Sequence, residues 1–254
     1  MATYDFNTST PSGVTDRSTQ RSLLSKTFLY MFAFLAITVA VTVGTSLILR
    51  ACGLKVEGEY ITVPDNVAKA YFITMLSAGI AQIILTIVIA FTSLKRGKAA
   101  VVPIVLYAVC MGILISSFAL FLPWWVLAST FGIACLCFAA MAILGLTIKR
   151  ATGLAIVGFG LLFGVMMASL FNIFIFVFAR ELWNGVILAT SLIIVVAIML
   201  ITAYDVYNIK QISARCTPDG NLAFFLAFNL YLDFIIILIH LLRLVAIVTS
   251  NSRR

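Results

Sequence analysis

Residues 222–248 read LAFFLAFNLYLDFIIILIHLLRLVAIV, an apolar stretch long enough to cross a bilayer. It contains Asp233, and the apolar stretch before it, residues 185–204, runs directly into Asp205. A carboxylate in hydrocarbon costs at least roughly 2.5–3.5 kcal/mol on insertion scales, so such a residue rarely faces lipid. It usually lines a water path or finds a partner inside a helix bundle. We therefore expect the two aspartates to mark the functional site of the protein.

The composition indicates an integral membrane protein. Of the 254 residues, 63% are hydrophobic and 10% are charged. A soluble domain has about 25% charged residues, so this chain could not cover a water-facing surface. The net charge of +8 comes from basic residues that cluster at the ends of apolar stretches. Such residues set membrane topology, and we do not expect binding to nucleic acid. The five cysteines show no pattern of a disulfide framework or zinc site.

Seven stretches have the length and apolarity of membrane spans. They are residues 28–49, 70–94, 99–122, 126–148, 153–179, 185–204 and 222–248, the sixth running on through Asp205 toward residue 212. We therefore predict an all-α polytopic membrane protein with seven transmembrane helices. Its parts are a polar tail expected to be disordered, a seven-helix membrane domain and a short C-terminal tail, at residues 1–27, 28–248 and 249–254.

The distribution of Lys and Arg predicts the orientation. If the N-terminus is cytoplasmic and the spans alternate, more basic residues lie on the inside than on the outside. Seven full spans then place the C-terminus outside. A re-entrant last segment would leave both termini in the cytoplasm, and the sequence does not exclude this alternative.

Polar residues within several spans recur at the spacing that places them on one face of a helix. The clearest stripes are Asn229, Asp233, His240 and Arg243 in the last span, and Gln82 and Thr86 in the second. We expect such faces to turn toward the interior of the bundle. A purely structural alternative is that Thr, Ser, Asn and Gln hold helices together, at about 0.6 kcal/mol for each contact. We favour that interpretation for Thr38, Thr42 and Thr45 of the first span.

Asp205 and Asp233 can meet if the last two spans are antiparallel neighbours. Asp205 lies roughly 10 Å of helix from residue 212, and Asp233 roughly 16 Å from residue 222. Two carboxyl groups that meet in a low-dielectric site share a proton and titrate as a unit. The shared proton links the helices, and its loss leaves like charges that repel or recruit a cation. Carboxylate oxygens suit Ca²⁺, although a full site needs about six to eight oxygens.

Two motifs carry a family resemblance. ITAYDVYNIKQI at 201–212 and NLYLDFIIILIHLLRL at 229–244 resemble the Bax inhibitor motif family of membrane proteins, including its bacterial members. The order of the spans and the chain length agree over about residues 20–250. The resemblance implies six helices packed around a central seventh. It also implies a pH-sensitive Ca²⁺ leak gated by Asp205 and Asp233, which would contact calcium.

The resemblance further implies residues that support the ion path. In the family a basic residue near the end of the second span pairs with the two acids, and the candidates here are Lys95 and Arg96. Tyr231 lies within the second motif. His240 stands where the family usually has an uncharged polar residue. As the only histidine, it either titrates near neutral pH or serves as an inward hydrogen-bonding group. Asn229, Arg243, Gln82 and Thr86 complete the expected set.

Three functions remain in competition. The first is the pH-gated Ca²⁺ leak, the second a proton-coupled Ca²⁺ exchanger, and the third an interaction protein that modulates a membrane protease or a cell-death partner. We expect no enzyme, because the sequence shows no phosphate loop, HExxH helix or Ser/His/Asp set at one depth. We expect the lipid bilayer, Ca²⁺ and H⁺ as partners, no resident cofactor, and calcium as the permeant ion. The expected location is the cell (inner) membrane, or an organelle membrane in a eukaryote.

Overall fold

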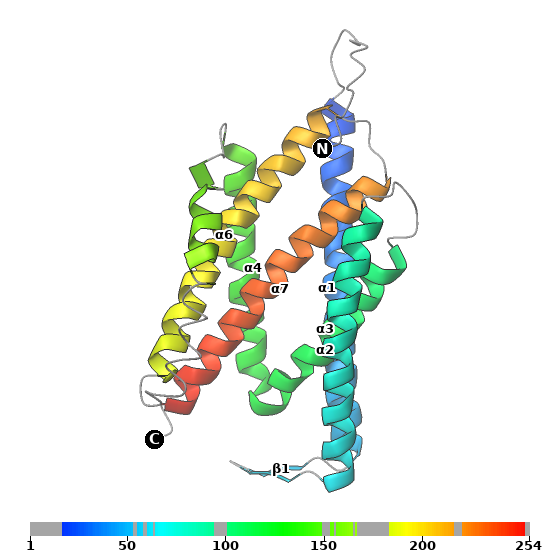
Figure 1. Ribbon diagram of the computed structural model, residues 1–254, viewed down its shortest axis with the longest axis vertical. Helices are drawn as coiled ribbons and strands as arrows, with labels where there is room; N and C mark the ends of the chain where they lie inside the picture. The colour runs from blue at the N-terminus through cyan, green and yellow to red at the C-terminus, as the bar shows by residue number, and fades with distance from the viewer. Residues whose placement is uncertain are drawn as a thin grey trace.

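The computed structural model describes residues 17–52, 55–57, 60–62, 64–93, 101–148, 153–154, 156–164, 166, 183–215 and 220–251. Its helices are α1 (Arg17–Ala51), α2 (Asp65–Ser93), α3 (Val101–Phe121), α4 (Trp124–Thr147), α6 (Trp183–Arg215) and α7 (Gly220–Asn251). Figure 1 shows them as one bundle, in which α6 and α7 are inclined to the other helices.

The helices confirm the predicted all-α membrane class. In the described part of the chain, 6 helices are long and apolar enough to cross a membrane. They imply association with a lipid bilayer, where a helix satisfies every backbone N–H and C=O internally. The fifth predicted span, residues 153–179, lies mostly outside the described residues, although residues 156–164 are helical.

The first helix begins earlier in the chain than the first predicted span. Helix α1 begins at Arg17, inside the segment predicted as a disordered tail, whose first 16 residues lie outside the described part. Leu23 and Thr27 are buried, and the Thr27 hydroxyl donates to the Leu23 carbonyl at 2.9 Å. A hydroxyl that bonds to its own helix can enter an apolar core, which explains why the polar composition of this segment placed the helix start too late.

The connection between α1 and α2 contains two short strands that the sequence analysis did not predict. β1 (Lys55–Glu57) and β2 (Tyr60–Thr62) pair antiparallel, with Val56 opposite Ile61. This hairpin lies at the end of the bundle where α7 ends (Figure 1).

Helix α7 crosses the whole bundle. It is a continuous helix of 32 residues, which excludes the re-entrant alternative. The start of α1 and the end of α7 lie at opposite ends of the bundle (Figure 1). This arrangement fits the predicted topology, while the assignment of the two ends to cytoplasm and outside stays a prediction.

The predicted central position of the last helix is confirmed. α7 packs against α1, α3, α4 and α6. In its most apolar window 61% of the residues are buried, against 11% in α2. α2 packs mainly against α3 and therefore forms the periphery of the bundle.

The contact between α4 and α6 depends on a close approach of the two backbones. A Cβ atom at Gly145 of α4 would collide with the carbonyl oxygen of Ala203 and would lie 2.9 Å from Cβ of Val206. At the same end of α4, the Lys210 ammonium group donates a hydrogen bond of 2.6 Å to the Leu146 carbonyl. That bond satisfies one of the carbonyls that a helix C-terminus leaves unpaired. α6 is thus fixed against α4 near Asp205.

We predict that Gly145→Ala destabilises the protein, because the added methyl group must push α6 away from α4. Overpacking of this kind costs typically 1–3 kcal/mol. Thermal unfolding in detergent should show a clear decrease in Tm. Gly132→Ala on the same helix is the matched control, because a Cβ there would meet nothing within 4 Å. Equal melting of the two variants would contradict the close approach.

Candidate functional site

The interface between α6 and α7 brings the two predicted acids together. The side chain of Asp233 is buried, with 7% of its surface exposed, and Asp205 is half-buried. The Asp205 carboxyl lies close enough for its charge to act on Asp233. The two acids therefore lie within electrostatic range of each other at the interface between α6 and α7, in the membrane-spanning part of the bundle.

Thr202 is the third polar side chain at this interface. It lies almost one helical turn before Asp205 and is within hydrogen-bonding range of Asp233. Its hydroxyl donates to the Ile198 carbonyl at 2.8 Å. The lone pairs of such a hydroxyl can accept from a protonated carboxyl, and rotation about the C–O bond can present its hydrogen to an ionised one. Thr202 can therefore form a hydrogen bond with Asp233 in both protonation states of the carboxyl group.

The Asp233 carboxyl is incompletely satisfied. Its Oδ2 atom is buried and has no hydrogen-bond partner among the described residues. An ionised carboxylate without donors is unfavourable in an apolar interior. Among the side chains that the structure describes, no basic group forms an ion pair with either acid, and the predicted partners Lys95 and Arg96 lie outside that part of the chain.

The polar stripe of α7 turns inward only in part. Asp233 is buried, Asn229 and His240 are half-buried, and Arg243 is exposed. The imidazole Nδ1 of His240 is buried without a hydrogen-bond partner in the described part of the chain. Arg243 lies one turn further and acts electrostatically on His240. A long basic side chain near a helix end reaches out to water, so the predicted inward position is wrong for Arg243.

Tyr231 lies on the face of α7 opposite Asp233 and contacts α1, whose Thr38 in turn bonds to α3. Its buried hydroxyl lies 2.7 Å from Oγ1 of Thr38, and that oxygen lies 3.2 Å from the carbonyl oxygen of Ala108. Thr42, one turn further along α1, donates to the carbonyl of Gly112 at 3.0 Å. The structural interpretation of Thr38 and Thr42 is confirmed. The Tyr231 contact is a feature that spacing within single helices does not reveal.

Gln82 and Thr86 lie at a different interface from the two acids. The Gln82 amide contacts the sulfur of Met111 on α3 at 3.1 Å, and both side chains approach the Tyr107 hydroxyl. Thr86 is exposed and donates to its own helix at the Gln82 carbonyl, at 2.8 Å. The Tyr107 ring packs edge-on against Phe228 of α7, with 5.2 Å between ring centroids. The α2 stripe thus approaches α7 through Tyr107, a residue of α3 that the sequence analysis missed.

The two acids alone would make an incomplete calcium site. Among the described residues, no group of three or more His, Cys, Asp or Glu side chains could hold a metal ion. Asp205 and Asp233 together offer at most four carboxylate oxygens, whereas Ca²⁺ takes about six to eight oxygen ligands.

These features define a polytopic helical membrane protein with a carboxyl pair between its last two helices. The family described as Inhibitor of apoptosis-promoting Bax1 matches residues 20–250. The chain belongs to this family, which confirms the resemblance found in the two motifs. An uncharacterized protein of Borreliella burgdorferi is 32% identical over 145 residues, which cover 54% of this chain. The match spans 59% of the length of that curated relative.

We predict that Thr38→Val and Tyr231→Phe are coupled in a double-mutant cycle of stability. Each single variant leaves the partner hydroxyl without its bond, whereas the double variant removes both groups. Hydrogen bonds between membrane helices give coupling energies of about 0.6 kcal/mol on average and at most about 1.7 kcal/mol. Unfolding in mixed micelles measures the coupling.

The control cycle combines Tyr231→Phe with Thr130→Val. Thr130 is also buried, but its hydroxyl donates within its own helix to the Val126 carbonyl at 2.7 Å. The effects in this cycle should be additive, and equal coupling in both cycles would contradict a direct Thr38–Tyr231 bond.

Proposed function

We propose that the protein is a pH-sensitive Ca²⁺ leak, controlled by one proton shared between Asp205 and Asp233. The observation that carries this proposal is the Asp233 carboxyl, which is buried in the central helix, lies within electrostatic range of Asp205 and has one oxygen without a described partner. Membership in a membrane-protein family with the same two motifs supports it.

The proposed mechanism follows from the energy of two like charges. With one proton on the pair, a hydrogen bond joins α6 and α7 and the path stays closed. When the proton leaves, both carboxylates are charged. Two unit charges at about 4 Å repel by roughly 4 kcal/mol at an effective dielectric constant of about 20. A typical polar contact between membrane helices contributes only about 0.6 kcal/mol. The repulsion therefore exceeds what single contacts can resist, unless a cation enters between the carboxylates.

Weak binding of Ca²⁺ fits a leak. Conduction requires a site attractive enough to admit an ion and weak enough to release it. A pair of carboxylates without further acidic ligands meets both conditions. Thr202 then adds a neutral oxygen ligand beside the pair.

Two orphaned polar atoms support a hydrated path along α7. Asp233 Oδ2 and His240 Nδ1 are both buried without described partners, and they lie seven residues apart on one helix face. This separation corresponds to roughly 10 Å at about 1.5 Å per residue. Buried polar atoms without protein partners are the groups that internal water satisfies. Water between these positions would carry an ion from the acid pair toward the end of α7 where Arg243 is exposed. A pH-sensing role for His240 stays a prediction.

We predict that calcium flux into liposomes rises with pH in the wild type and loses this dependence in Asp205→Asn and Asp233→Asn. Release of one proton changes the open fraction by at most about tenfold per pH unit. An Asn amide occupies the same space but does not titrate, so the link no longer responds to pH. A calcium-sensitive dye inside the liposomes measures the flux.

Asp65→Asn is the control, because Asp65 begins α2 at the end of the bundle and should keep both flux and pH response. An unchanged pH response in both variants of the acid pair would rule out the proposed gate. It would favour a role in binding a membrane partner, which does not require these aspartates.

A second experiment separates a leak from a proton-coupled exchanger, because the shared proton would also serve exchange. Liposomes receive a pH gradient with equal Ca²⁺ on both sides. A passive leak should produce no net accumulation of Ca²⁺, since nothing couples proton flow to calcium movement. If Ca²⁺ accumulates against its gradient and a protonophore abolishes this accumulation, the protein is an exchanger and the proposed leak is wrong.

A further inference from the structure

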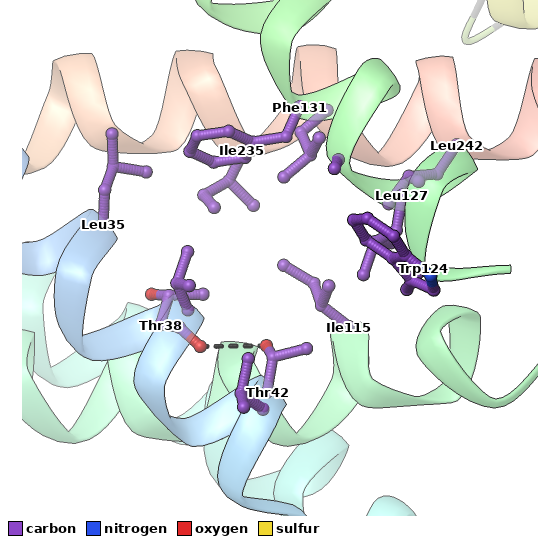
Figure 2. Close-up of a pocket in the computed structure, with 13 residues that line it drawn as sticks. Leu35, Thr38, Thr42, Ile115, Trp124, Leu127, Phe131, Ile235 and Leu242 are labelled. Carbon is purple, nitrogen blue, oxygen red and sulfur yellow. Dashed lines mark hydrogen bonds between the residues drawn. The ribbon is translucent and has the colours of Figure 1, made fainter. Parts of the chain in front are cut away.

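A cavity of about 380 Å³ lies on the other side of α7 from the acid pair. Its walls come from α1, α3, α4 and α7, as Figure 2 shows. α7 contributes Ile235, Leu238 and Leu242. At about 100° of rotation per residue, these three positions point roughly 140–200° away from Asp233. The cavity is therefore separate from the proposed ion path.

The cavity offers an occupant almost nothing polar. Its lining includes no charged residue, and most of it is aliphatic or aromatic. The two threonines in the wall are already engaged: Thr42 donates to the carbonyl of Gly112, and Thr38 lies against the Tyr231 hydroxyl. A dry apolar site of this kind selects a hydrocarbon group.

The cavity is continuous with the membrane-facing surface of the bundle. Val39 and Val43 of α1 line it and are 43% and 49% exposed. Trp124, the first residue of α4, lies at its edge and is 78% exposed. Tryptophan is enriched at the boundary between hydrocarbon and headgroups. The opening between α1 and α4 thus faces lipid tails, with an aromatic side chain placed at the depth where headgroups begin.

We propose that this cavity binds one acyl chain of a membrane phospholipid, which enters sideways from the bilayer between α1 and α4. The volume lies within the range of about 300–1,000 Å³ typical of small-ligand sites. A chain that moves from lipid into the cavity gains little hydrophobic energy, because both surroundings are hydrocarbon. Its binding comes from dispersion contacts with walls that otherwise face a void. The chain lies against Thr38 and therefore next to the link between α1 and α7.

Photo-cross-linking tests the proposal on the full chain in liposomes. The probe is a phosphatidylcholine with a diazirine in one acyl chain, and mass spectrometry maps the labelled residues. We expect Val39, Val43 and Leu127 to be labelled several-fold more than Ile83 and Ile84. The latter two are exposed on the peripheral helix α2 and serve as a reference for ordinary lipid contact. Equal labelling of both groups would overturn the proposal, whatever the behaviour of the variants.

A variant that fills the cavity provides a second test of the proposal. Ala128 lines the cavity, so Ala128→Phe should reduce the labelling of its walls several-fold. Ala139→Phe is the matched control, because Ala139 is exposed on the same helix outside the lining. Unchanged labelling in Ala128→Phe would contradict an occupied cavity. Cross-links between two protein chains at these walls would show that a second copy fills it. Neither readout depends on calcium flux, so this proposal and the leak can fail separately.

Discussion

The carboxyl groups of Asp205 and Asp233 lie within electrostatic range of each other between α6 and α7, and the Asp233 side chain is buried. Asp233 lies on α7, which packs against α1, α3, α4 and α6, and no basic side chain among the described residues pairs with it. Charge on the pair is worth several kcal/mol in such surroundings, while each neutral polar contact between helices is worth a fraction of that. On the proposed mechanism, the protonation of this one pair of side chains therefore outweighs many of the individual contacts that hold α6 and α7 together.

α7 has two faces with different chemistry. One face carries Asp233 and His240, whose buried polar atoms lack described partners. The opposite face carries Tyr231 and the apolar wall of the cavity, where hydroxyl groups are paired. Asymmetry of this kind lets one helix separate a hydrated region from hydrocarbon. It also places the proposed acyl chain and the proposed ion path on opposite sides of the same helix. A shift of α7 would therefore change the shape of both.

Hydropathy predicted the class and most of the spans because a helix in lipid must be both long and apolar. The same reasoning located Asp205 and Asp233, whose cost in hydrocarbon is large enough to require a partner. It failed for Arg243, because a long side chain can reach water. The Thr38–Tyr231 bond and the cavity depend on how separate helices pack, which periodicity within one helix does not record.

Gly145 shows that the position of Asp205 depends on a residue of a neighbouring helix. Its missing side chain lets α4 lie directly against the backbone of α6 at Ala203, two residues before Asp205. The position of α6 beside Asp205 therefore depends on the absence of a Cβ atom at Gly145. On the proposed mechanism, a homologue could keep both aspartates and still lose the proton link through a single methyl group on α4. In judging whether a relative shares this chemistry, the residue at this position is as informative as the acids themselves.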